Sequence, residues 1–149
     1  MRIHIGSDHA GLVLKAELVK HLTANGHDVT DHGPHEYDAL DDYPDFCIPA
    51  AEAVAKDPTS LGIVLGGSGN GEQMAANKVK GIRAALAWSI ETAKLARDHN
   101  NANVIAVGGR MHEISFVKEI IDTFIASPFS NDERHIRRIK KISDFENKG

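Results

Sequence analysis

The residues best suited to chemistry lie in the stretch "IVLGGSGNGEQMAANK", residues 63–78. Four glycines follow an apolar run, and the first side chain past the last of them is the carboxylate of Glu72. Such a strand-to-helix turn can hold an oxyanion with its free backbone N–H groups. A general base beside it could remove a proton next to a carbonyl and stabilise the resulting enediolate. The alternative is that Glu72 only complements the dipole of the helix that follows.

Two familiar phosphate-binding motifs do not fit this loop. A Walker A sequence needs a lysine where "GGSGNGE" has Glu72, and "GSDHAGL" at residues 6–12 has Leu12 there. A dinucleotide fingerprint counted from Gly67 again meets Glu72 at its third glycine position. ATP, GTP and NAD sites of these kinds are therefore disfavoured.

Further polar residues follow other predicted strands. Asp8 and His9 in "GSDHAG", Ser68 in the glycine loop and Arg110 in "VGGRMH" each come just after an apolar run. In doubly wound folds, ligands bind at the carboxyl ends of the strands, so these residues are expected to converge on one edge. Taken singly, Asp8 could simply cap a helix and Arg110 could be a surface charge.

A third set of candidates lies toward the C-terminus. His99 and Asn100 in "ARDHNNANV" end a predicted helix, where an imidazole could exchange protons near neutral pH. The alternative is an Asn-rich turn with a histidine favoured by the helix C-terminus. Arg134 and Arg138 are four residues apart on one helical face, which suits a phosphate dianion but is equally common on a solvated surface.

Two other features are interpreted as unreactive. The segment "HGPHEYDALDDYPD" is rich in His and Asp but matches neither HExxH nor an EF-hand loop, so no metal site is expected. Cys47 lies among apolar residues in "PDFCIPAAEA" without an evident activating partner, which is typical of a core thiol.

Hydrophobic periodicity predicts alternating strands and helices. The region around Pro44 and Pro49 is expected to be a helix with an uncertain start, and Ser130 with Glu133 predicts a capping box for a last helix beyond Pro128. Strands are expected at residues 2–6, 27–33, 62–67, 82–88 and 102–109, and helices at 10–24, 71–79, 89–98 and 112–126. This order predicts one doubly wound, Rossmann-like α/β domain over residues 1–149, with three layers, a parallel sheet of about five strands and an extra C-terminal helix.

Two helical faces can be assigned from the same periodicity. In the helix at 10–24, Leu12, Ala16, Val19 and Leu22 are expected to face the core, and Gly26 is expected to end the helix. In the last helix, the apolar residues step by three, so their stripe winds around the helix and could touch a second subunit; they are Ile136, Ile139, Ile142 and Phe145.

Composition narrows the class of protein. The 149 residues are 42% hydrophobic and 26% charged, as in an ordinary globular domain. The formal net charge of −4 argues against a nucleic-acid or anionic-membrane partner. The N-terminus lacks the apolar run of a signal peptide, and the single cysteine, Cys47, fits a reducing compartment. A cytoplasmic location is expected.

Four motifs occur in order along the chain: "GSDHAG", "GGSGNGEQMAANK", "ARDHNNANVIAVGGR" and "ERHIRRI". Together they resemble the type B ribose-5-phosphate isomerase family, whose wider membership includes isomerases of galactose 6-phosphate and allose 6-phosphate. The sequence is similar to the branch in which a glutamate is the enolising base. The other branch has a cysteine at the start of the glycine loop, where this chain has Gly66.

The resemblance implies a role for each candidate. Glu72 would move the proton between C2 and C1, and His99 would open the furanose ring with Asp8 as a helper. The remaining residues would bind substrate: the loop Gly67, Ser68, Gly69, Asn70 and Gly71 at the enediolate oxygens, and His9, Asn100, Arg110, Arg134 and Arg138 at the phosphate and hydroxyl groups. The resemblance also implies no metal or organic cofactor, and a homodimer or tetramer whose sites are shared between subunits.

Three functions follow as alternatives. The first is isomerisation of ribose 5-phosphate and ribulose 5-phosphate, and the second is the same reaction on a six-carbon sugar phosphate. The third is a non-catalytic module that binds a sugar phosphate or nucleotide. A binding module needs neither the base Glu72 nor the ring opener His99, whereas the choice between five and six carbons depends on the depth of the pocket.

Overall fold

The chain forms one parallel sheet with helices on both faces, in a computed structural model that describes residues 1–148. Its elements follow one another in the order β1 (Arg2–Ser7), α1 (Leu12–Ala24), β2 (Asp28–Asp31), α2 (Pro44–Lys56), β3 (Leu61–Gly66), α3 (Asn70–Asn77), β4 (Ala84–Leu86), α4 (Ile90–Asp98), β5 (Val104–Gly108), α5 (Ile114–Ala126) and α6 (Glu133–Glu146). A short 3₁₀ turn, His9–Gly11, precedes α1.

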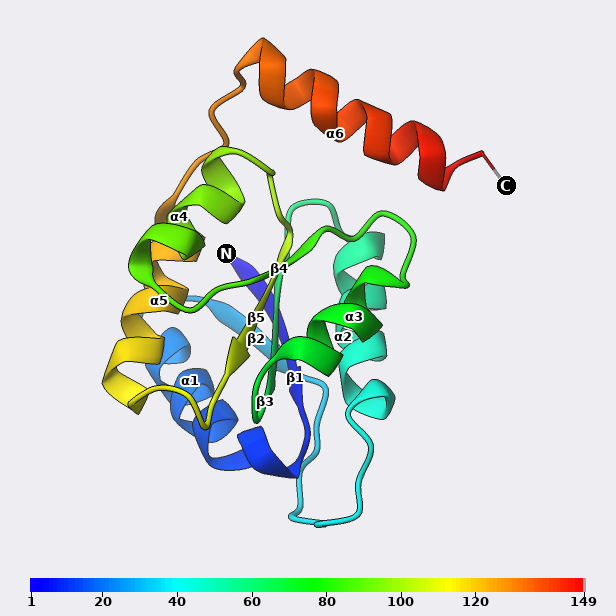
Figure 1. Ribbon diagram of the computed structural model, residues 1–149. Coiled ribbons are helices and arrows are strands. Elements are labelled where there is room, and N and C mark those ends of the chain that lie inside the picture. Colours follow the sequence, from blue (N-terminus) through cyan, green and yellow to red (C-terminus); the bar gives the residue numbers. More distant parts are fainter. Residues whose placement is uncertain (149) are drawn as a thin grey trace.

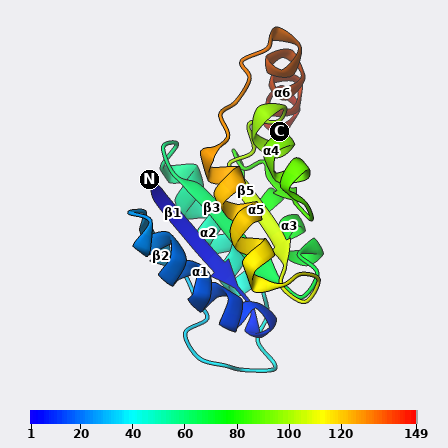
Figure 2. The ribbon, with the colours of Figure 1, turned by 90° about the vertical axis from the view of Figure 1, so that its left-hand side faces the viewer.

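The strand order is β2-β1-β3-β5-β4, and every neighbouring pair is parallel. One face of the sheet packs against α1, α4 and α5, and the other packs against α2 and α3, as Figures 1 and 2 show. The central strands β3 and β5 are buried along their whole length, which explains their continuous apolar sequences. The predicted doubly wound, three-layer fold is confirmed.

Two details differ from the expectations. The buried positions of α1 include Leu14, Leu18 and Leu22, spaced by four, whereas the predicted core residue Ala16 is exposed. The strand predicted over 82–88 is reduced to Ala84–Leu86, because it is an edge strand that pairs only with β5. Gly26 does follow the end of α1, with a φ of 87° that favours glycine.

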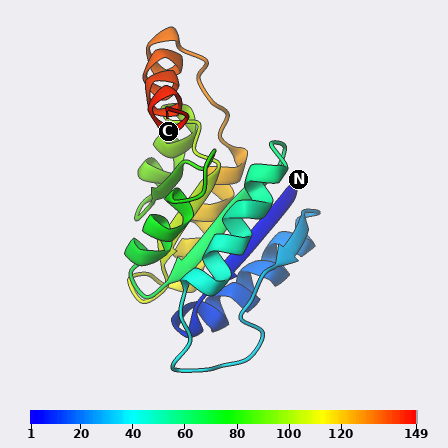
Figure 3. The same ribbon diagram turned by 90° about the vertical axis from the view of Figure 1, so that its right-hand side faces the viewer.

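Helix α6 extends away from the sheet (Figure 3). Its N-cap is Asp132, whose side chain accepts a hydrogen bond from the Arg134 N–H, so the predicted capping box of Ser130 and Glu133 is wrong. Ser130 instead hydrogen-bonds the Asp132 N–H and the His135 ring, which turns the chain into the helix. Among residues 1–148, no helix is long and apolar enough to cross a membrane.

Candidate functional site

The carboxyl ends of β1, β3 and β5 gather one group of the predicted site residues. These three strands are neighbours in the sheet, and their last residues are in register: Ser7 pairs with Leu65, and Gly66 pairs with Gly108. The segments that follow them carry Asp8 and His9, then the glycine loop and Glu72, then Arg110. The sheet therefore brings together residues that are about a hundred positions apart in the sequence.

The glycine loop packs with its backbone directly against the end of β5. Gly69 has a φ of +86° and caps α3, and a Cβ there would come within 2.7 Å of Leu86 and 3.0 Å of the Val107 backbone. A Cβ on Gly108 would approach the Ser68 carbonyl oxygen at 2.6 Å. Glycines at these positions therefore allow a close approach that any side chain would prevent.

The turn after β5 is fixed to the same loop. The Gly109 N–H donates to the Gly66 carbonyl at 2.7 Å, and the Arg110 N–H donates to the Gly67 carbonyl at 3.1 Å. The exposed Arg110 side chain lies across Gly67, with Nη1 3.5 Å from where a Cβ on that glycine would stand. Its guanidinium group is thus available to an anion that binds over the loop.

Glu72 is a buried carboxylate at the mouth of this loop. Its side chain folds back over Gly66, and the residue is only 4% exposed. Its Oε2 atom is buried without a hydrogen-bond partner among the described residues. Burial raises the pKa of Glu72, the charge of Asp8 raises it further, and its own backbone N–H opposes the shift in part. A carboxylate with a raised pKa and a free oxygen suits proton abstraction near neutral pH.

A pH profile tests this environment. If Glu72 acts as a general base it must be ionised, and kcat/KM of the wild-type protein is then expected to fall as pH drops through the raised pKa of Glu72. Replacing Asp8 with Asn removes one cause of the shift, so the acid limb should move to lower pH. An acid limb that stays in place in Asp8→Asn would contradict the coupling between the two carboxyl groups.

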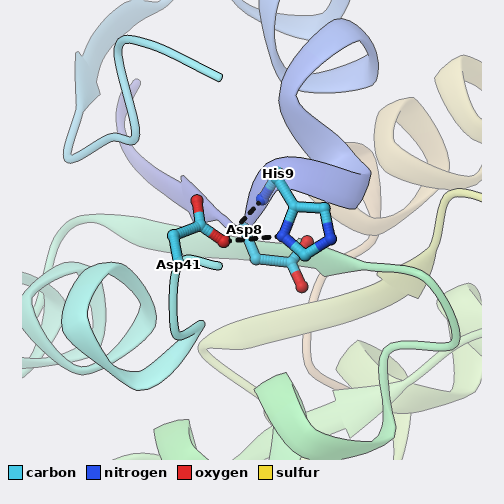
Figure 4. A group of neighbouring side chains, drawn as sticks. All are labelled: Asp8, His9 and Asp41. Carbon is cyan, nitrogen blue, oxygen red and sulfur yellow. Dashed lines mark hydrogen bonds and ion pairs between the residues drawn. The ribbon is translucent and has the colours of Figure 1, made fainter. Parts of the chain in front are cut away.

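Asp8 and His9 are both held by hydrogen bonds in the turn after β1. Asp8 Oδ1 accepts from the Ala10 and Gly11 N–H groups at 2.9 and 3.2 Å, so this residue does cap the 3₁₀ turn. The His9 ring contacts Asp41, which belongs to the loop between β2 and α2 (Figure 4). Asp8, His9 and Asp41 offer potential metal-ligand atoms within 4.8 Å of one another. The expectation that no metal binds stays a prediction.

Tyr43 is a site residue that sequence reasoning did not identify. Its hydroxyl lies 2.6 Å from where a Cβ on Gly71 would stand, so the ring rests on the glycine loop. It comes from the segment that was interpreted only as a poor metal motif, 28 positions before Gly71. The sequence does not predict the contact between Tyr43 and the glycine loop, because that contact depends on how α2 packs against α3.

Cys47 lies behind the site, on the core-facing side of α2. The residue is fully buried, and burial together with the negative charges of Glu72 and Asp8 raises the pKa of its thiol far above the usual range. A thiol held neutral in this way is a poor nucleophile, which confirms the interpretation as a core residue.

The remaining candidates form a second group at the opposite edge of the sheet. His99 and Asn100 follow α4 and precede β5, and the His99 ring packs against His135 of α6 with 4.4 Å between ring centroids. Arg134 and Arg138 are exposed on the same helix. Because β5 has five residues, the two edges are at least roughly 13 Å apart at about 3.3 Å per residue. One chain does not bring His99 to Glu72.

Two arginines hold the loop that carries His99 and Asn100. Arg83 donates to the Asn100 and Asn101 carbonyls at 3.0 and 2.7 Å. Arg97 donates to the Asn101 side chain at 3.0 Å and to the Ala102 carbonyl at 2.6 Å. Asn101 has a φ of 44°, in the left-handed region that asparagine adopts more often than most other non-glycine residues. These hydrogen bonds hold the backbone of residues 100–102 in place.

Comparison with known proteins agrees with this geometry. The family model described as Ribose/Galactose Isomerase matches residues 3–142. The chain is 57% identical to a ribose-5-phosphate isomerase B of Mycolicibacterium paratuberculosis, over 98% of this chain and 92% of that one. It is 41% identical to a galactose-6-phosphate isomerase subunit of Clostridium acetobutylicum, over 97% and 83% of the two chains.

Solved structures give the same result. The ribose-5-phosphate isomerase B of Mycoplasma genitalium with bound ribulose-5-phosphate superposes with a TM-score of 0.96 and 46% identity, covering 99% of this chain and 97% of the other. The type B enzyme of Trypanosoma cruzi superposes with a TM-score of 0.94 and 39% identity, covering 100% of both chains. The fold, the glycine loop with its buried glutamate, and these matches over nearly the whole length show that the chain belongs to the Ribose/Galactose Isomerase family.

Proposed function

We propose that the chain is an aldose–ketose isomerase that interconverts D-ribose 5-phosphate and D-ribulose 5-phosphate. The buried carboxylate of Glu72, with a raised pKa and its free Oε2 beside the glycine loop, is the observation that carries this assignment. The match to a solved relative with bound ribulose-5-phosphate supports the choice of sugar. Residues 1–149 act as one isomerase domain, and the single buried cysteine fits a cytoplasmic location.

The reaction needs a base, an anion site and a fixed sugar. Glu72 takes the proton from C2 of the open-chain aldose, the electron pair forms the C1–C2 double bond, and the C1 carbonyl oxygen becomes an enediolate oxygen. The loop from Gly67 to Gly71, with Ser68 and Asn70, stabilises this charge through N–H and side-chain donors. The hydroxyl proton then moves from O2 to O1, protonated Glu72 returns its proton to C1, and the carbonyl forms at C2.

The phosphate belongs at the other end of the sugar, away from Glu72. Arg110 and His9 supply cationic or donor groups on the same edge of the sheet as the base. His99 opens the furanose ring by proton transfer, with Asp8 as a helper, and Asn100 binds a hydroxyl group. Arg134 and Arg138 neutralise the phosphate. This arrangement separates the carboxylate base from the anion, which would otherwise repel it.

The second group of residues must come from another copy of the chain. Since His99 and Glu72 lie at opposite edges of one sheet, a complete site requires two chains, and a homodimer is the smallest assembly that provides it. The surface around α6 supports this: Ile142 and Phe145 are 56% and 78% exposed, and Trp88 is 60% exposed. A cavity of about 690 Å³ separates α6 from the edge strand β4, and Leu86, Trp88 and Ile142 are among its lining residues.

A six-carbon sugar 6-phosphate is the second candidate substrate. The identity to a galactose-6-phosphate isomerase subunit favours it enough to require a test. Both substrates use the same base, ring opener and phosphate site, so they differ only in the room between the two ends of the pocket.

An isomerisation assay on the purified protein tests the proposal. We expect turnover of ribose 5-phosphate that EDTA does not abolish. For allose 6-phosphate and galactose 6-phosphate we expect kcat/KM to be at least ten-fold lower, since one extra carbon in a pocket changes kcat/KM by about 10–200-fold. Higher kcat/KM on a hexose phosphate would replace the substrate assignment. If a folded oligomer turns over neither class of sugar phosphate, the remaining function is a non-catalytic module that binds a sugar phosphate or nucleotide.

A further inference from the structure

His9 is fixed by the loop between β2 and α2, residues 32–43. Asp41 Oδ1 accepts two hydrogen bonds from this one residue: from the His9 backbone N–H at 3.0 Å and from the ring Nδ1 at 2.7 Å. Figure 4 shows the carboxyl group of Asp41 beside the imidazole, with both interactions reaching the same oxygen. Tyr37 of the same loop meets the ring edge-on, with centroids 5.9 Å apart.

The Asp41 carboxylate depends on this contact. Its side chain is only 7% exposed, and Oδ2 is buried without a hydrogen-bond partner among residues 1–148. A buried carboxylate is costly unless a donor or an opposite charge compensates it. Apart from the His9 backbone N–H, the imidazole is its hydrogen-bond donor, so the two side chains stabilise each other.

This pairing determines what the ring can do. A carboxylate only accepts hydrogen bonds, so the proton of His9 resides on Nδ1 and Nε2 is left as the contact atom for a ligand. In the imidazolium form, Nε2 carries a proton of its own and donates a hydrogen bond to an anion. The ring is 24% exposed, which leaves one side open to a ligand.

We propose that Asp41 is a positioning residue that fixes the His9 imidazole with its proton on Nδ1 and presents Nε2 to the phosphate of the substrate. The inference rests on the proposed function, in which His9 contacts that phosphate. Under this proposal, the loop between β2 and α2 contributes to substrate binding through Asp41. A cation at Asp8, His9 and Asp41 is the competing interpretation, but Asp8 Oδ1 already caps the 3₁₀ turn and Nδ1 already binds Asp41.

The kinetic test is Asp41→Asn. Asparagine keeps an acceptor oxygen and the volume but removes the charge, so we expect KM for ribose 5-phosphate to rise about ten-fold, the worth of one charge-assisted hydrogen bond, with kcat within about two-fold of wild type. Inhibition by inorganic phosphate should weaken in parallel. Asp38→Asn is the matched control, because Asp38 is exposed in the same loop and its side chain accepts a hydrogen bond from the Leu40 N–H, not from His9. Its KM should not change.

Nitrogen-15 NMR of histidine-labelled protein gives a readout that does not depend on turnover. The His9 signals, assigned by their loss in His9→Gln, should show a protonated Nδ1, and inorganic phosphate should shift Nε2. In Asp41→Asn the phosphate concentration needed for that shift should rise about ten-fold. If this holds in a protein that isomerises no sugar, the proposed function fails and the role of Asp41 stands.

Three results would overturn the proposal. One is a KM and a phosphate response in Asp41→Asn that equal those of Asp38→Asn. Another is a fall in kcat at unchanged KM, which would place Asp41 in the chemical step. The third is displacement of the Nδ1 proton by a divalent cation such as Zn²⁺ at micromolar concentration, which would make the cluster a metal site.

Discussion

Replacing Glu72 with Gln is expected to lower kcat by roughly 10²–10⁴-fold, the range that general base catalysis supplies. Glutamine has nearly the same volume and cannot remove a carbon-bound proton. Because Arg110 and His9 are untouched, binding of ribose 5-phosphate should stay within a few-fold of wild type, as isothermal calorimetry would show. Near-normal turnover by Glu72→Gln, measured on protein freed of host isomerases, would refute the assignment of the base.

The same substitution should stabilise the fold. The folded protein holds the Glu72 proton more tightly than the unfolded chain does, since burial raises the folded pKa above the ordinary glutamate value of 4.5. Ionisation therefore costs stability as pH rises from the unfolded toward the folded pKa, and the cost is complete above the latter. Glu72→Gln should unfold at a higher temperature than wild type at mildly alkaline pH, and the difference should vanish below pH 4.5. A lower midpoint at alkaline pH would contradict this.

Replacing Gly66 with Ala is expected to remove activity for a different reason. A Cβ at position 66 would overlap the carboxyl group of Glu72, so the base must swing away from the glycine loop. A misplacement of about 1 Å can cost on the order of 10²-fold in rate, and we expect at least that loss in kcat. In the cysteine branch of the family that the sequence resembles, the cysteine would stand at this same position, where a side chain would compete with the Glu72 carboxyl group for one volume.

Gly67→Ala is the matched comparison for this effect. The atoms nearest to a Cβ on Gly67 belong to the Arg110 side chain, at 3.5 Å, which is an ordinary contact. We expect a smaller loss of kcat than in Gly66→Ala, with both variants folded by circular dichroism. Equal kcat losses in the two variants would show that the loop backbone is sensitive to any methyl group, and that the overlap with Glu72 is not the cause.

The sequence predicted the fold because the hydrophobic pattern of each segment agrees with the burial of the helix or strand that it forms. The continuous apolar runs of β3 and β5 are buried along their whole length, and glycines or polar residues end them where the structure does. The predictions were wrong where tertiary contacts determine the structure. The face of α1 is set by packing on the sheet, and the start of α6 depends on Ser130 reaching His135, which no capping pattern contains.

The site was predictable only in part, for the same reason. Motif spacing identified Asp8, Glu72 and Arg110, because strand ends in a parallel sheet share an edge. Tyr43 and Asp41 were missed, since their contacts depend on a loop with no regular structure of its own. The separation of His99 from Glu72 arises because His99 precedes β5 whereas Glu72 follows β3, which places the two residues at opposite edges of the parallel sheet.

Subunit complementation tests most directly whether one site is built from two chains. Glu72→Gln and His99→Asn chains with different affinity tags are each expected to be inactive alone, and tagged heterodimers are isolated after the chains are refolded together. If His99 serves the Glu72 of its partner, every heterodimer has one site with both changes and one intact site, so its activity should recover to about half of wild type. If His99 acts on the Glu72 of its own chain, both sites stay defective, and a heterodimer as inactive as its parents would contradict the shared site.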